Sequence, residues 1–469
     1  MRNRRSLSSL FGLMLLAGCT VGPDFVRPTP ALPVAWQARG AAPAEARWWR
    51  VFSDPVLDAL EDKADTANLD LRIALERIEA ARATRGLARA DAAPTLSGQA
   101  SYSRERIGTK GIAAIAAPLL GLESVAQSPK GVDFNLYSVG AGANWELDLW
   151  GKHRRQIESA QASLAATDAE ARGVRLSVQA EVACGYFQLR GLWAERRLAA
   201  ERQAMAAQSI AIATTLTSRG LATPIDLAEA QSRDRQIRDD LSDLDDQAAR
   251  ASRALAVLIG SDPDAQPVAP NDAYALPAPE APAGRLSSDL ARNRPDIVAA
   301  EAKLHGATAA IGVAQADFYP NISLTGLFSL DALNLDALGW NVRNTSIGPS
   351  VSLPIFDGGR IRGQVAVRTS EQRGAALAYQ QTVRGAWREV DDALGLVRTL
   401  QTRGTLADAE LQARQQTVAA LEARFRRGDI AAAPLLDARA AMVTAETARV
   451  RLRIAALLAQ IQLRRGLGG

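Results

Sequence analysis

The sequence contains few of the residues on which metal, redox and nucleophilic chemistry depend. Only two of its 469 residues are cysteines, Cys19 and Cys184, and only two are histidines, His153 and His305. Neither histidine has cysteine or acidic neighbours at metal-site spacing. No nucleophile-elbow, P-loop or paired-glycine phosphate motif occurs in a strand–turn–helix context. We therefore expect neither an enzyme nor a cofactor or metal. Cys184 falls within a helical pattern, which favours a small buried residue over a redox site.

An excess of charge of one sign is also missing. The formal net charge is +4, and Arg2, Arg4 and Arg5 lie in a segment that we expect to be removed, which leaves about +1. A near-neutral chain gives no support for binding nucleic acid. Aromatic residues make up only 5% of the chain, which is rich in alanine. This composition favours long helices rather than disorder.

The apolar run near the N-terminus is too short to span a bilayer. It follows a basic start and ends in small residues, which is the layout of a secretory signal over residues 1–18. The segment LLAGC resembles a bacterial lipobox, in which Cys19 becomes the lipid-modified first residue. In the sorting pattern that this resembles, Thr20 in place of an aspartate directs the protein to the outer membrane. The alternative is an ordinary signal peptide with an incidental cysteine.

The remaining chain divides by composition. Proline is frequent in residues 19–53, which we expect to form an extended, lipid-anchored tether because proline fixes φ and lacks a donor. A helix begins near Asp54 and opens a first repeat over residues 54–260. Residues 261–285 are rich in proline and acidic residues and are predicted to be a linker. A second repeat occupies residues 286–469.

A strand that runs directly into a very long helix dominates the first repeat. Apolar and polar residues alternate from Leu136 to Leu149, which predicts a strand with one apolar face. After Gly151 the apolar spacing changes to three, four and seven, and this helical pattern continues to Ser218. Such a helix would be roughly 100 Å long. Compact soluble domains have no room for such an element.

The same order of elements occurs twice. The segment ARADAAPTLSG at 88–98 matches AQADFYPNISL at 314–324, and Gly151-Lys152 corresponds to Gly359-Arg360. Each copy is predicted to contain helices, two strands, a long helix, a turn and a returning helix. Four strands cannot close a membrane barrel, and open edges would leave unpaired N–H and C=O groups in lipid. Several chains must therefore pool their strands, and three chains would supply twelve.

Several separated motifs then resemble one family. CTVGPDF, WELDLWGK, RPDIVAAEAKL, ADFYPNISL and LPIFDGGR are similar to segments of the outer membrane factor family, the TolC-type efflux channels, and of its OprM/NodT-like lipoprotein branch. The resemblance implies a homotrimer with a twelve-stranded β-barrel in the outer membrane of a Gram-negative bacterium and a long α-helical barrel in the periplasm (an α+β, TolC-like fold). It also implies a periplasmic adaptor and an inner-membrane pump of the resistance-nodulation-division type, which together expel drugs or other small molecules.

The resemblance also implies roles for residues at the two predicted helix–helix turns. Asp437 aligns with an aspartate of the periplasmic gate, and Asp226 aligns with one that helps to hold the tip closed. TolC itself has a second gate aspartate where Pro434 stands here, so Leu435 is expected to contribute apolar closure instead. Docking to the adaptor is expected at the two tips, which carry the residues Arg219, Gly220, Leu221, Arg427, Gly428 and Asp429. An ordinary solvated charge remains the alternative for Asp437.

Two other functions stay open at this point. The same family also serves as exit ducts for proteins in type I secretion. A non-conducting lipoprotein with a coiled-coil stalk would also explain the long heptad-like helices. It would not explain the four alternating strands or the duplication.

Overall fold

We describe the protein from a computed structural model. The structure describes residues 20–28, 47–107, 132–269, 276–277 and 294–468, so the predicted signal peptide, Cys19 and most of the predicted tether lie outside the described residues. The chain forms two compact units. The first comprises the described residues within 1–27, 80–164 and 302–376, and the second those within 28–79, 165–301 and 377–469. Each repeat therefore contributes to both units.

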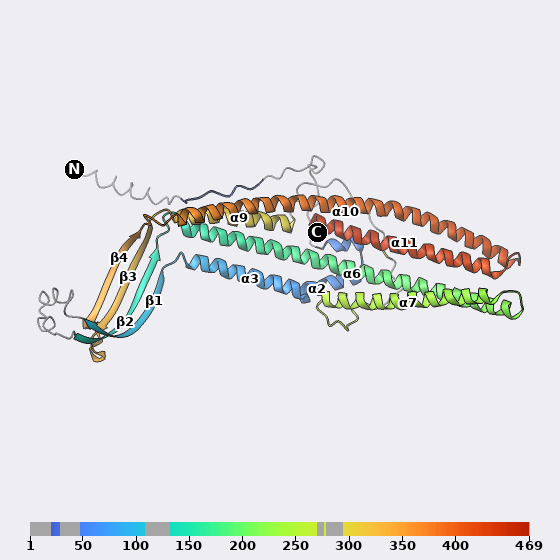
Figure 1. The fold of residues 1–469 in the computed structure, drawn as a ribbon, viewed down its shortest axis with the longest axis horizontal. Coiled ribbons are helices and arrows are strands. Elements are labelled where there is room, and N and C mark those ends of the chain that lie inside the picture. The colour runs from blue at the N-terminus through green and yellow to red at the C-terminus, as the bar shows by residue number, and fades with distance from the viewer. Residues whose placement is uncertain (1–19, 29–46, 108–131, 270–275, 278–293, 469) are drawn as a thin grey trace. The chain divides into compact units, whose positions relative to one another are not determined.

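The described residues of the first repeat form four helices and two strands after a short 3-10 helix (Figure 1). In chain order the elements are η2 (Trp48–Phe52), α2 (Pro55–Ala67), α3 (Leu69–Ala90), β1 (Thr95–Ile107), β2 (Val132–Glu146), α6 (Lys152–Ser218) and α7 (Pro224–Leu258). The long helix that the apolar spacing predicts thus begins one residue after Gly151. At 67 residues α6 is roughly 100 Å long.

The second repeat has the same order of elements. It consists of α9 (Pro295–Ala316), β3 (Asn321–Ala332), the short turns η3 (Leu335–Ala337) and η4 (Trp340–Val342), β4 (Arg343–Ser352), α10 (Arg360–Arg426) and α11 (Ala432–Leu467). α9 begins and ends 226 residues after α3, and α10 begins and ends 208 residues after α6. The internal duplication predicted from the sequence is thereby confirmed at the level of whole elements.

Capping aspartates determine where three of the helices begin. The Asp54 carboxylate accepts hydrogen bonds from the N–H groups of Val56 and Leu57 at the start of α2. Before α6, Asp148 accepts from the N–H groups of His153 and Arg154. These bonds satisfy N–H groups that have no partner within the helix. Asp357 does the same before α10, and the bonds from the N–H groups of Ile361 and Gly359 lower the pKa of its carboxyl.

The four strands form one antiparallel sheet in the order β1-β2-β3-β4 (Figure 1). Thr95 pairs with Asn144 between β1 and β2, and Trp145 pairs with Leu324 between β2 and β3. Within the described residues, β1 and β4 each have a strand neighbour on one side only. The sheet therefore ends in two open edges.

The largest hydrophobic core lies in the second unit, around α2 and the middle of α6. Trp48, Trp49 and Phe52 are buried there, and Phe52 packs edge to face on Phe187 with ring centroids 5.1 Å apart. The expectation of an extended tether up to residue 53 therefore does not hold for Trp48–Phe52. Three large aromatic side chains within five residues stabilise more by packing in a core than in an extended tether.

A buried polar network fastens α2 to α6 within this core. The Arg190 guanidinium lies 2.7 Å from the Asp54 carboxylate, and both side chains are buried. The Tyr186 hydroxyl donates to the same carboxylate at 2.9 Å, and burial raises the pKa of Tyr186. Asp54 thus both caps α2 and joins it to α6.

Candidate functional site: a two-faced sheet, two hairpin tips and an N-terminal strap

The sheet has one polar and one apolar face because side chains alternate along each strand. On the polar face Asp331 of β3 accepts hydrogen bonds from the hydroxyls of Ser138 (2.5 Å) and Ser329 (2.7 Å) and from the amide of Asn344 (2.7 Å). These groups belong to β2, β3 and β4. On the opposite face of β2 and β3, Val139 pairs with Leu330. One face therefore suits water and the other suits lipid.

Aromatic side chains occur at both ends of the strands. Tyr102 and Tyr137 pack together with ring centroids 4.9 Å apart, and Phe328 lies 5.6 Å from Trp340. At the other end of β2, the indole N–H of Trp145 donates to the Ala92 carbonyl oxygen at 3.1 Å. Trp145 follows Tyr137 by eight positions along the strand, a distance of roughly 26 Å before any tilt. Membrane barrels show the same arrangement, with an apolar band of about 25 Å between two aromatic girdles.

Both hairpin tips end their long helix in the same way. After α6 the N–H of Leu221 donates to the Leu216 carbonyl oxygen and that of Gly220 to Thr217, and Gly220 has a φ of +70°. After α10 the corresponding bonds come from Asp429 and Gly428, whose φ is +78°. This is the Schellman motif, in which glycine takes the left-handed conformation without a steric penalty. Arg219, Leu221, Arg427 and Asp429 are exposed.

The two tips differ in how the returning helix begins. The Thr223 hydroxyl accepts from the N–H of Asp226, while the Asp226 carboxylate accepts from the N–H of Thr223, which forms a capping box at the start of α7. The bonds from the Thr223 backbone and hydroxyl lower the pKa of Asp226. Ala431 occupies the N-cap of α11 and provides no side-chain bond. Asp226 therefore has a structural task in the single chain.

The other two predicted gate residues occupy different surroundings. The Asp437 side chain is 73% exposed, and its carboxylate lies 3.9 Å from the Arg233 guanidinium of α7. Arg233 also lies 3.7 Å from Glu229, which precedes Asp437 by the 208-residue repeat distance. Leu435 is buried, with 5% exposure, and so packs within its own chain. Of the three candidates, Asp226 and Asp437 are exposed, and Leu435 is not.

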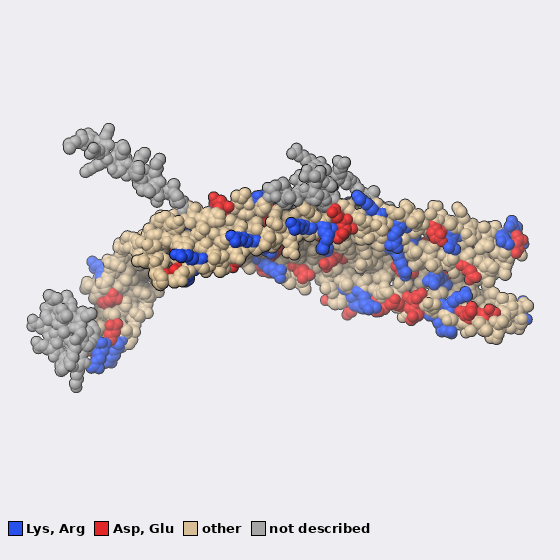
Figure 2. All heavy atoms as spheres, turned by 45° about the horizontal axis from the view of Figure 1, so that its top comes forward, with Lys and Arg blue, Asp and Glu red and all other residues tan. Residues whose placement is uncertain are grey.

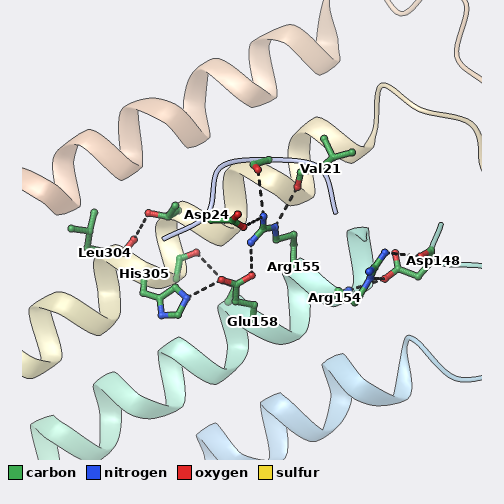
Figure 3. A network of polar contacts seen from close by, with 12 residues as sticks. Val21, Asp24, Asp148, Arg154, Arg155, Glu158, Leu304 and His305 are labelled. Carbon is green, nitrogen blue, oxygen red and sulfur yellow. Dashed lines mark hydrogen bonds and ion pairs between the residues drawn. The ribbon is translucent and has the colours of Figure 1, made fainter. Parts of the chain in front are cut away.

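Near the start of α6, residues 20–27 form a strap that lies against α9 and against the side chain of Arg155 from α6 (Figure 3). The buried Arg155 guanidinium donates to the carbonyl oxygens of Val21 and Gly22 (3.3 Å each) and lies 2.7 Å from the Asp24 carboxylate. The N–H of Val21 donates to the Trp150 carbonyl oxygen at 3.0 Å. These contacts hold the residues that immediately follow Cys19 against the start of α6.

The second half of the strap packs on α9. The Phe25 ring stacks on His305 with centroids 4.4 Å apart, and His305 Nε2 lies 2.8 Å from the Glu158 carboxylate. Burial alone would raise the pKa of Glu158, but hydrogen bonds from Arg155 and His305 lower it. The sequence predicted an extended tether over this stretch and did not predict its contacts with α6 and α9. The available signal was the pair of charged residues Arg155 and Glu158 near the start of the long helix, three positions apart and therefore on one face.

The described residues contain no cluster of side chains suited to binding a metal ion. No group of three or more histidine, cysteine, aspartate or glutamate side chains there could hold a metal ion. Cys184 is half-buried, and burial raises the pKa of its thiol to about 11. On the face drawn in Figure 2, the acidic and basic side chains of the described residues are interspersed rather than collected into a field of one sign.

Comparison with known proteins agrees with this geometry. The sequence profile of the family described as "Outer membrane efflux protein" matches residues 60–261 and 286–469. The chain belongs to this outer membrane efflux family. It is 33% identical over 474 residues to the outer membrane protein OprJ of Pseudomonas aeruginosa, covering 99% of this chain and 95% of OprJ. The cation efflux system protein CusC of Escherichia coli is 29% identical and 97% of each chain is covered.

The fold comparison leads to the same family. The solved outer-membrane channel OprN is similar with a TM-score of 0.83 and 30% identity, covering 96% of this chain and 99% of that one. The prediction of a TolC-like fold is thereby confirmed. Members of this family are channels, so the protein is an outer membrane efflux channel that extends into the periplasm and is not an enzyme.

Proposed function

We propose that three copies of this chain form a passive conduit for small molecules, which an inner-membrane pump loads through a periplasmic adaptor. The two open edges of the sheet support this proposal most directly. Unpaired backbone groups at β1 and β4 are too costly to leave in lipid. Three four-stranded sheets give a closed twelve-stranded barrel, which removes every edge.

The proposal includes a lipid anchor on Cys19. This residue lies outside the described residues, but Thr20 and Val21 follow it directly and are held at the start of α6. Consecutive Cα atoms are 3.8 Å apart, so a lipid on Cys19 would begin close to the base of the strands. The strap thus supports attachment to the inner leaflet of the outer membrane.

The partners are proposed by their chemistry. The exposed residues of the tips, which include Leu221 and the Arg427–Asp429 pair, offer an apolar point and paired charges to the hairpins of an adaptor. A pump of the resistance-nodulation-division type would supply the driving force. Relatives are named for efflux of cations and toluene and for export of pyoverdine, so we place small molecules rather than proteins in the pore.

The gate is proposed at Asp437. Three carboxylates around one axis would repel each other and attract cations, which favours a cation-selective constriction. Within the chain the Arg233 guanidinium lies 3.9 Å from the Asp437 carboxylate, which would weaken that repulsion.

Single-channel recording in planar bilayers tests this function. The purified protein should give discrete conductance steps with a preference for cations, and Asp437→Asn should bring the cation-to-anion permeability ratio toward one. Glu229→Gln is the matched control, because it removes a carboxylate at the equivalent position of the first repeat and contacts the same Arg233. Absence of conductance steps from correctly assembled protein would refute the channel. Equal shifts in both variants would refute the gate assignment.

A further inference from the structure

The two open edges of the sheet carry large apolar side chains that nothing in the single chain covers. Beside β4, Ile355 is 95% exposed, and on β1 Leu96 is 80% exposed. Both belong to the first unit. The open edges therefore need a partner strand with matching apolar residues at matching heights.

The internal duplication predicts which residues meet across the edge. Thr95 pairs with Asn144 between β1 and β2, and Asn321 pairs with Ser352 between β3 and β4. Asn321 follows Thr95 by 226 residues, and Ser352 follows Asn144 by 208, which are the same offsets that relate the helices. β3 is thus the structural equivalent of β1, and β4 that of β2, residue by residue.

The contact between β2 and β3 then has an equivalent between β4 and a second copy of β1. Trp145 pairs with Leu324, and the N–H of Leu147 donates to the Ile322 carbonyl oxygen at 2.8 Å. Each β2 residue has its equivalent 208 positions later, in or just after β4, and each β3 residue has its equivalent 226 positions earlier, in β1. The pair Trp145–Leu324 therefore corresponds to Leu353–Gly98, and the pair Leu147–Ile322 corresponds to Ile355–Leu96.

We propose that β4 of one copy pairs antiparallel with β1 of the next copy in this single register, with Ile355 opposite Leu96. The inference rests on the proposed trimer and specifies its seam. On the apolar face this register gives the pairs Thr345–Arg106, Ile347–Arg104, Pro349–Tyr102, Val351–Ala100, Leu353–Gly98 and Ile355–Leu96.

The chemistry of both faces agrees with this register. Ser350 falls opposite Ser101, and Ser352 opposite Gln99, so the polar face of β4 continues into the polar face of β1. A slip by one residue would place serines of one strand on the face that carries Ile355 and Leu96, which is why register is strongly specified in two-faced sheets. Ile355, which is 95% exposed in the single chain, and Leu96, which is 80% exposed, become direct neighbours.

Pro349 fits the same seam. In β2 the N–H of Leu147 points toward β3, so the equivalent Ile355 donates toward the next copy. Pro349 lies six residues earlier, an even number, and its nitrogen faces the same way because donors alternate along a strand. A proline there removes one hydrogen bond from the seam between copies and none between β3 and β4. β4 is an edge strand within the single chain, and edge strands are one of the few places where sheets accept proline.

Paired cysteines on the polar face test the register. Ser350→Cys with Ser101→Cys places two thiols directly opposite, at a non-hydrogen-bonded pair whose Cα atoms lie about 4.5 Å apart, within the range of roughly 4.4–6.8 Å that a disulfide needs. The matched controls combine Ser350→Cys with Ser103→Cys or with Gln99→Cys. Each control moves one thiol by two residues on the same face, to about 8 Å. Cys184→Ser is present in every protein, including the reference.

Full-length protein is oxidised with copper phenanthroline in membranes and separated with and without reductant, while the oligomeric state of the reference is measured by native mass spectrometry in detergent. The expected result is reductant-sensitive dimers and trimers for the 101/350 pair, at least about tenfold more than for either control and for the single variants. Stronger linkage in a control pair overturns the register. If the reference protein is trimeric but none of the pairs forms a disulfide, the proposed seam is wrong and the proposed trimer is unaffected. If the reference protein is monomeric, the proposed trimer itself is wrong.

Discussion

The two halves of this duplicated chain have the same elements but differ in what covers them. α6 and α10 both contain 67 residues, yet one large hydrophobic residue is exposed on α6, Leu216, whereas five are exposed on α10: Val367, Leu377, Leu396, Leu406 and Phe425. The first helices show the opposite order. α3 exposes Leu69, Ile73, Leu75 and Leu87, and α9 exposes none of its large hydrophobic residues.

The difference in exposure depends on whether a helix is joined to an edge strand or to an inner strand of the sheet. α3 precedes β1 and α10 follows β4, and these are the two edge strands. α6 and α9 are joined to the inner strands, and Gly306 of α9 lies against Ala162 of α6. In each pair of equivalent helices, the apolar residues of one helix (α6 or α9) are covered by its own chain. Those of the other helix (α10 or α3) would be covered by a neighbouring copy. A gene duplication followed by self-assembly produces this asymmetry.

The largest effect is expected where a covered position is compared with its uncovered equivalent. Arg190→Ala should lower the free energy of unfolding by about 3–5 kcal/mol, because it leaves the buried Asp54 carboxylate without its cation. Arg398 lies 208 residues later on α10 and is exposed. Arg398→Ala should therefore change the free energy of unfolding by less than about 0.5 kcal/mol. Urea unfolding in detergent, followed by circular dichroism, measures both. Similar losses in the two variants would remove the distinction between covered and uncovered helices.

Glu61 of α2 sharpens the comparison through pH. Its side chain is fully buried in the first-repeat core, and burial, with Asp65, Asp58 and Asp62 nearby, raises its pKa from 4.5 to about 9. Between these values only the folded state keeps the proton, so stability should fall as pH rises, by about 1.4 kcal/mol per unit. Glu61→Gln stays neutral and should abolish this slope between pH 6 and 8.

The control for this experiment is Asp70→Asn, which alters an exposed carboxylate on the neighbouring helix α3. It should leave the dependence of stability on pH parallel to that of the reference protein. If Glu61→Gln also runs parallel to the reference, the Glu61 carboxyl is not the group responsible.

The strap contacts α6 of the first repeat and α9 of the second, and one glycine of α9 tests it. A Cβ on Gly312 would lie 2.8 Å from the Val21 carbonyl oxygen and 2.9 Å from Cγ of Arg155. Overpacking of this kind costs about 1–3 kcal/mol, so Gly312→Ala should displace the strap and speed chymotrypsin cleavage after Phe25 roughly tenfold. Gly306→Ala on the same helix meets Ala162 at an ordinary 3.5 Å. Its cleavage rate, read by mass spectrometry, should match the reference.

The smallest effect is expected at the two tips. Thr223→Ala removes the capping box of α7 and should lower local stability by about 1 kcal/mol. The reciprocal change, Ala431→Thr at the uncapped tip, should stabilise α11 by less, because Pro434 occupies the position of Asp226 and cannot complete the box. Hydrogen–deuterium exchange of the first-turn amides reports both changes. Faster exchange at α11 in Ala431→Thr would contradict the capping argument.

Much of the architecture was predictable because it depends on local periodicity. The alternation up to Leu149 and the helical spacing after Gly151 predict β2 and α6, and the predicted end at Ser218 agrees with the structure. The glycines at 220 and 428 likewise predict turns, since their left-handed backbone is a property of the residue itself. The match of 88–98 with 314–324 predicts the duplication, which also relates the strand registers.

The functional residues were less predictable because their surroundings come from distant segments. Asp226 aligned with a gate residue, but its carboxylate accepts a hydrogen bond from the N–H of Thr223, three residues earlier. Leu435 was expected to contribute closure, yet it is buried in the single chain. Whether these residues also act in a gate stays a prediction, and only Asp226 and Asp437 are exposed in the single chain.

By itself the sequence determined the order, length and two-faced character of the elements, because each of these follows from spacing along one segment. Only the tertiary structure decided which faces are covered, since covering a face requires a partner far away in the chain. It seated the strap on Arg155, buried Trp48 and Trp49 against α6, and left Leu96 and Ile355 bare at the sheet edges. Burial of apolar area is non-directional, so spacing shows that a face must be covered but not by what.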